Sequence, residues 1–145
     1  MTLKASTGLR TTMLGNSSFD DAMGSPVLML FTGTIPATAD AAITGTLLCI
    51  VSDDATGDPL LFDVPAGGVI PKDPAQVWRG PVTVSGTATH WRLVDSTDDG
   101  TASTTACRVQ GLCAVAASDM NMSNVNLTAG GSQSIDACNL IFPTY

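Results

Sequence analysis

The sequence predicts an all-β fold, an antiparallel β-sandwich or jelly roll of about eight strands with a short N-terminal helix or arm. Charged residues make up only 13% of the chain, and glutamate is absent, whereas threonine, alanine, glycine, serine and aspartate are abundant. Threonine suits a pleated surface, and aspartate, glycine and serine suit turns. Short apolar runs are separated by repeated turn signals, without the strand–helix alternation that a parallel sheet requires.

The strand-like runs follow one another between glycine, proline and aspartate clusters. They are Val27–Thr32, Thr46–Ser52, Leu60–Val64, Val82–Ser85, Thr87–Asp95, Ala106–Ala116, Val125–Thr128 and Ser134–Phe142. Thr87–Asp95 alternates most clearly, with Trp91 and Leu93 on the face opposite Arg92. In Ala106–Ala116 we expect a bend or bulge near Gly111, since glycine within a strand often marks one.

The only helix that the sequence predicts lies in the first part of the chain. Residues 3–15 would form it, with Ser6 as the N-cap and Gly15 at the end. The length of 145 residues fits one domain. We therefore divide the chain into an N-terminal arm or short helix, residues 1–25, and a single β-sandwich domain, residues 26–145.

The predicted helix is too short to be stable alone in water, so it must dock on the sandwich or on a neighbouring molecule. Its apolar residues and one cation are the residues that we expect to contact a partner. This predicted partner interface consists of Leu3, Leu9, Arg10, Met13 and Leu14.

Charge and hydropathy argue against several classes of partner. The formal net charge is −7, with only six Lys and Arg among 13 Asp, so no nucleic-acid partner is expected. The most apolar stretch, residues 27–51, is interrupted by Gly33, Pro36, Asp40 and Gly45, so no membrane span is expected. The first residues lack the apolar core of a signal peptide.

The residue types needed for catalysis or metal binding do not occur in suitable patterns. His90 is the only histidine, and it lies in a strand pattern without a nucleophile motif. The four cysteines show no zinc spacing, so we expect free, mostly buried thiols. The aspartate clusters at 53–58 and 95–99 read as turns. We therefore predict no enzyme activity, no catalytic residue, no cofactor and no metal site.

Two tryptophans leave one alternative open. Trp78 and Trp91 could form a platform on which sugars stack, which would make the chain a carbohydrate-binding β-sandwich. Large aromatic side chains are more often core or interface anchors in a domain with only 5% aromatic residues.

Three segments together resemble a group of small virion proteins of tailed bacteriophages: Ala5–Arg10, Phe31–Leu48 and Ala117–Ser123. The resemblance covers most of the chain in the same order, although the cysteines and the proline-rich region 65–81 depart from the pattern. Within this group, size and acidity best match head decoration, or cement, proteins with a jelly-roll fold.

The resemblance implies a place in the virion. The chain would sit on the outer capsid surface after assembly in the host cytoplasm. It would form a homo-oligomer, often a trimer, and bridge and stabilise subunits of the major capsid protein. The alternative within the same group is a neck, collar or tail structural protein, which also assembles as a ring.

Overall fold

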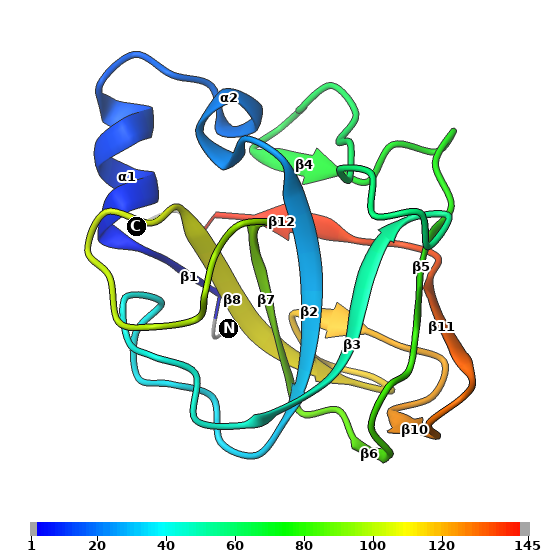
Figure 1. Cartoon of the computed structure of the whole chain (residues 1–145). Helices are drawn as coiled ribbons and strands as arrows, with labels where there is room; N and C mark the ends of the chain where they lie inside the picture. The colour runs from blue at the N-terminus through cyan, green and yellow to red at the C-terminus, as the bar shows by residue number, and fades with distance from the viewer. Residues whose placement is uncertain (1–2, 143–145) are drawn as a thin grey trace.

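The computed structural model describes residues 3–142 (Figure 1). Two helices precede most of the strands, and the predicted antiparallel all-β fold with a short N-terminal helix is confirmed. The elements are β1 (Lys4–Ala5), α1 (Thr7–Leu14), α2 (Phe19–Met23), β2 (Pro26–Thr32), β3 (Thr46–Asp53), β4 (Val69–Pro71), β5 (Trp78–Pro81), β6 (Gly86–Thr87), β7 (His90–Asp95), β8 (Arg108–Ala114), β9 (Met120–Asn121), β10 (Asn126–Leu127), β11 (Ser132–Ile135) and β12 (Asn139–Ile141).

The main sheet has eight strands in the order β1-β8-β7-β2-β3-β5-β11, with β9 added in parallel to β8. Its other pairings are antiparallel, and β2 lies between β3 and β7. The register of β2 against β3 shifts between Leu30 and Phe31. The register of β7 against β8 is continuous through Gly111, so the bulge that the sequence placed there is absent.

Gly111 has a packing role instead. A Cβ atom there would lie 2.9 Å from Cζ2 of Trp91 and 3.0 Å from Cβ of Asp119. Such distances are too short for a side chain, so glycine is the residue that lets the Trp91 ring cross the neighbouring strand.

Two small two-stranded sheets, β4–β12 and β6–β10, complete the fold. The predicted strand Ser134–Phe142 is divided between β11 and β12, which pair with β5 and β4 respectively. The predicted strand Leu60–Val64 is wrong, because this segment forms only an isolated bridge between Phe62 and Lys72.

The apolar core lies on one face of the main sheet. It contains Trp91 and Leu93 of β7, together with Leu127, Ile135 and Leu140 from the strands that follow. The other face carries His90, Arg92 and Val94 of β7, which are also buried. Long loops, residues 33–45 and 96–107, approach this second face. At β7 both faces of the sheet are thus covered.

The N-terminal segment packs on the same structure. Ser6 is the N-cap of α1 and accepts a hydrogen bond from the Leu9 N–H, as predicted. Leu9 is fully buried in the apolar core. The second helix, α2, was not predicted, although its N-cap Ser18 and its first-turn aspartates are typical of a helix start.

All four cysteines are unpaired, as expected from the sequence. Burial raises the pKa of Cys49 to about 11 and that of Cys113 to about 12. Within residues 3–142, no helix has the length and apolar character needed to cross a membrane.

Candidate functional site

A hollow of about 630 Å³ lies beside the N-terminal segment. We call it the N-terminal groove, and its lining residues are Leu3, Lys4, Ala5, Arg10, Met13, Leu14, Thr38, Ala39, Asp40 and Phe142. The structure thus brings together Leu3, Arg10, Met13 and Leu14 from the predicted partner interface. Leu9 lies apart from them, because its side chain is fully buried in the core.

A second, smaller hollow of about 320 Å³ adjoins the groove. The two share Leu3, and Ile141 in the second hollow is the chain neighbour of Phe142 in the first. The remaining lining residues are Leu112, Ala117, Ser118, Asp119 and Asn139. The two hollows therefore lie next to each other on one surface of the molecule.

Three segments that are distant in sequence meet at this surface, and they are the three that carried the resemblance. Ala5–Arg10 and part of Phe31–Leu48 line the N-terminal groove. Ala117–Ser123 contributes to the adjoining hollow. Parts of all three segments thus line two neighbouring hollows.

Asp40 joins one wall of the groove to α1. Its carboxylate accepts hydrogen bonds from the Thr7 N–H at 2.8 Å and from the Thr7 hydroxyl at 2.7 Å. These bonds, the hydroxyl one above all, lower the pKa of Asp40 from its ordinary value, and the positive charges of Arg10 and Arg108 act in the same direction. A carboxylate at this position also satisfies a first-turn N–H that the helix leaves unpaired.

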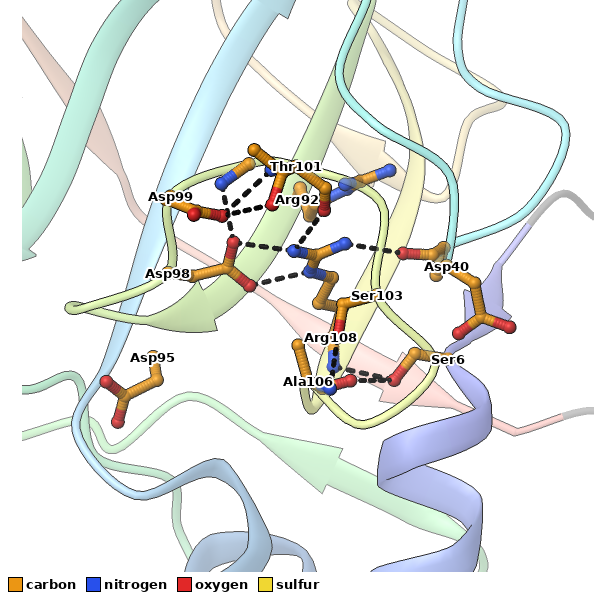
Figure 2. Close-up of polar contacts among 12 residues, drawn as sticks. Ser6, Asp40, Arg92, Asp95, Asp98, Asp99, Thr101, Ser103, Ala106 and Arg108 are labelled. Carbon is orange, nitrogen blue, oxygen red and sulfur yellow. Dashed lines mark hydrogen bonds and ion pairs between the residues drawn. The ribbon is translucent and has the colours of Figure 1, made fainter.

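A buried ion pair lies beneath the wall of the groove that contains Asp40 and holds it in place. Figure 2 shows the Arg108 guanidinium between Asp98 and the backbone beside Asp40. Arg108 contacts Asp98 at 2.6 and 2.8 Å and also donates to the carbonyl oxygens of Thr101 and Ala39. The side chains of Arg108 and Asp98 are 1% and 5% exposed. The pair therefore holds both long loops on the sheet.

The neighbouring strand adds a second buried cation. Arg92 donates to the Gln110 side-chain oxygen at 2.6 and 3.2 Å and to the Ala41 carbonyl oxygen at 3.0 Å. Gln110 in turn donates to the Pro36 carbonyl oxygen at 2.8 Å. Desolvation lowers the pKa of Arg92 to about 10, and repulsion from Arg108 adds to this. Arg92 still remains charged at neutral pH.

These arginines were not among the predicted functional residues. Each alternates in a strand with apolar residues, and this pattern is ordinarily that of a solvent-exposed face. Their burial depends on loops that the sequence pattern does not assign to that face. Asp40 and Phe142 were missed for the same reason, because each contributes to the groove through the folding of distant segments.

The other sequence candidates lie away from solvent or in turns. His90 is fully buried, stacks on Phe31 with ring centroids 5.4 Å apart, and leaves Nε2 without a hydrogen-bond partner among the described residues. Trp78 and Trp91 are 1% and 0% exposed, so neither presents a ring face on which a sugar could stack.

The aspartate clusters make hydrogen bonds within their own turns. Asp99 accepts from the Thr101 backbone and hydroxyl, and Asp98 accepts from the Gly100 N–H. In the part of the chain that the structure describes, no three His, Cys, Asp or Glu side chains are grouped so that they could hold a metal ion.

Comparisons of the chain with protein-family models, with curated proteins and with solved structures found no match.

Proposed function

We propose that this chain is a structural protein of a tailed-bacteriophage virion, of the head decoration type. It would sit on the outer capsid surface as a homo-oligomer, often a trimer, and bridge and stabilise subunits of the major capsid protein. The observation that supports this proposal is the meeting of the three resemblance segments at the N-terminal groove and its adjoining hollow. Parts of the segments that resemble virion proteins then line a recessed surface that could accept a protein partner.

Exposed apolar groups at the groove support an assembly role. Leu14 is 89% exposed at the end of α1, although a leucine in that position gains nothing from contact with water. Met13, Leu3 and Phe142 add further partly exposed apolar surface. Contact with another protein would bury these groups, at about 25 cal/mol for each Å² of apolar surface removed from water.

The location within the virion is tested by copy number. Quantitative gel analysis of purified particles should find this protein in amounts comparable to the major capsid protein, and in heads that lack tails. A few copies per particle, absent from tail-less heads, would contradict the decoration proposal and favour the alternative of a neck, collar or tail protein.

The role of the groove is tested with heads that lack the protein. Wild-type protein added to such heads should bind and raise their resistance to heat. Leu14→Ser should bind more weakly. Val64→Ser is the matched control, because Val64 is also an exposed aliphatic side chain, at 78%, but lies outside the groove. Equal loss of binding in both variants would contradict a role for the groove.

A further inference from the structure

The N-terminal groove combines apolar side chains with positive charge on a protein that is otherwise acidic. The chain has 13 Asp and six Lys and Arg, with a formal net charge of −7. The groove nevertheless has two cations, Lys4 and Arg10, and a single carboxylate, Asp40. This local excess of positive charge beside an apolar surface favours a ligand of opposite charge that also carries apolar side chains.

The other four basic side chains are engaged elsewhere. Arg92 and Arg108 are buried beneath the loops. Arg79 forms an ion pair with Asp54 at 2.6 Å. Lys72 donates to two backbone carbonyl oxygens and lies 5.8 Å from the centroid of a buried tryptophan ring. The cations left for a partner are therefore the two at the groove.

Neither groove cation forms an ion pair within residues 3–142. Arg10 is exposed, and its guanidinium donates to the Thr7 hydroxyl at 3.1 Å and to the Ser6 carbonyl oxygen at 3.4 Å. A guanidinium has five N–H donors, so further donors remain for a carboxylate. Lys4 donates to the Ala37 carbonyl oxygen at 2.6 Å, and an ammonium has three donors. Among the described residues Asp40 forms no ion pair with either cation, and each of its two oxygens accepts a hydrogen bond from Thr7.

The backbone beside the groove has a free sheet edge. Among residues 3–142, β1 is the last strand of the main sheet and pairs only with β8, with Lys4 opposite Gln110. The Ser6 N–H bonds the Arg108 carbonyl oxygen at 2.8 Å, one residue further along. Because hydrogen bonding alternates along an antiparallel pair, the Ala5 N–H and C=O point away from β8. Ala5 lines the groove, so a bound segment in an extended conformation can pair with it.

We propose that the N-terminal groove binds an extended acidic segment of a partner protein, which adds to the free edge of β1. Apolar side chains of that segment contact Leu3, Met13 and Phe142, and its carboxylates bind Lys4 and Arg10. Under the proposed function the partner is the major capsid protein, and only this identification rests on that function.

A defined peptide tests the chemistry of the groove. The probe is a fluorescein-labelled peptide of alternating aspartate and leucine, titrated with the whole protein and followed by fluorescence anisotropy. The same peptide with asparagine in place of aspartate, or with serine in place of leucine, should bind more weakly. Binding should also weaken as salt is raised, because exposed charges are screened.

Matched variants locate the site. Arg10→Gln should lower the affinity for the aspartate–leucine peptide about tenfold or more, since a charge-assisted hydrogen bond is lost. Arg79→Gln, which removes an exposed arginine outside the groove, should leave the affinity unchanged. Backbone amide NMR shifts on peptide addition should be confined to residues 3–14, 37–40 and 139–142. Circular dichroism checks that each variant is folded.

Several results would overturn the proposal. If the asparagine peptide bound as tightly as the aspartate peptide, or if Arg10→Gln left the affinity unchanged, the groove would not recognise carboxylates. A dimer in analytical ultracentrifugation that Arg10→Gln abolishes, without peptide binding, would assign the groove to a second copy of this chain. Peptide binding that appears only after removal of residues 143–145 would assign it to the chain's own C-terminal residues.

The same variants separate this inference from the proposed function. If Arg10→Gln protein loses affinity for the peptide but binds virion heads as wild type does, the major capsid protein is not the partner of the groove, and the decoration role stands. If the peptide binds as expected but the protein is absent from heads, the decoration role fails and the groove chemistry stands.

Discussion

Replacing Asp98 by alanine removes the carboxylate that faces the buried Arg108 guanidinium. Arg108 would keep its charge, because a guanidinium is not deprotonated at neutral pH. It would retain the Thr101 carbonyl oxygen at 2.8 Å and the Ala39 carbonyl oxygen at 3.4 Å. Neither oxygen neutralises a full positive charge. At 1% side-chain exposure, water cannot take the place of the carboxylate without opening the loops.

The expected cost follows from this burial. Breaking a buried ion pair by removing one partner costs about 3–5 kcal/mol. The Gly100 N–H also loses its acceptor. The cost of this lost hydrogen bond is included in the same range. Since the free energy of unfolding of a small domain is about 5–15 kcal/mol, the variant would lose a large part of its stability. A loss of 4 kcal/mol corresponds to a Tm lower by roughly 8–16 °C for a domain of this size.

Urea unfolding followed by tryptophan fluorescence measures this loss. Trp78 and Trp91 are both fully buried, so their emission reports the loss of the core. The midpoint should fall by about 2 M urea if the m-value is about 2 kcal/mol/M and unchanged. Asp99→Ala is the control, because Asp99 bonds only within its own exposed turn, and its midpoint should change little.

A double variant tests whether the loss of stability comes from the unpaired charge or from altered packing at the site. Asp98→Leu with Arg108→Met replaces the pair by apolar side chains, and such replacements are often neutral or stabilising. We expect this variant to be clearly more stable than Asp98→Ala alone. A loss below about 1 kcal/mol in Asp98→Ala, as for an exposed pair, would refute the reasoning that Arg108 and Asp98 are desolvated.

Three further predictions concern pH, packing and thiol reactivity. Burial lowers the pKa of His90, so below about pH 6.5 the unfolded chain binds a proton that the folded chain resists, and stability falls as the pH is lowered. In urea titrations between pH 7.5 and 5.5, His90→Leu should flatten this decline, and an identical slope in both proteins would contradict it. Gly8→Ala should destabilise the protein by about 1–3 kcal/mol in thermal unfolding, despite the better helix propensity of alanine, because the Cβ would overlap the Thr105 carbonyl oxygen. Gly15→Ala is its control, with the nearest atom at 3.3 Å, and an equal loss in both would argue against this overlap. Cys107, the half-buried thiol, should react first with a thiol reagent in the folded state, ahead of the buried Cys49, Cys113 and Cys138, and simultaneous labelling would indicate global opening instead.

Local patterns were sufficient for the strands that are apolar and sharply bounded. The predicted Val27–Thr32 and Thr46–Ser52 correspond to β2 and β3 within one residue at either end. Glycine, proline and aspartate follow these runs in the sequence, and such residues end a strand for reasons that are local to the backbone. The cap of α1 at Ser6 was predictable on the same grounds.

Pairing partners and loop positions were not predictable in this way. The continuous pattern of Ser134–Phe142 does not reveal that its two halves pair with β5 and β4. Alternation along a strand states which side chains share a face, but not which distant segment covers that face. For the same reason the sequence pattern does not reveal that the arginines of β7 and β8 are buried.

The candidate site shows the same division. The sequence by itself determined that the chain is an antiparallel β protein. It also singled out one group, Leu3, Leu9, Arg10, Met13 and Leu14, since short-range apolar spacing and capping are encoded in neighbouring residues. Only the tertiary structure decided that Leu9 enters the core while Asp40 and Phe142 join that group. The physical reason is that the groove depends on contacts between residues far apart in sequence, held in place by the buried pair of Arg108 and Asp98.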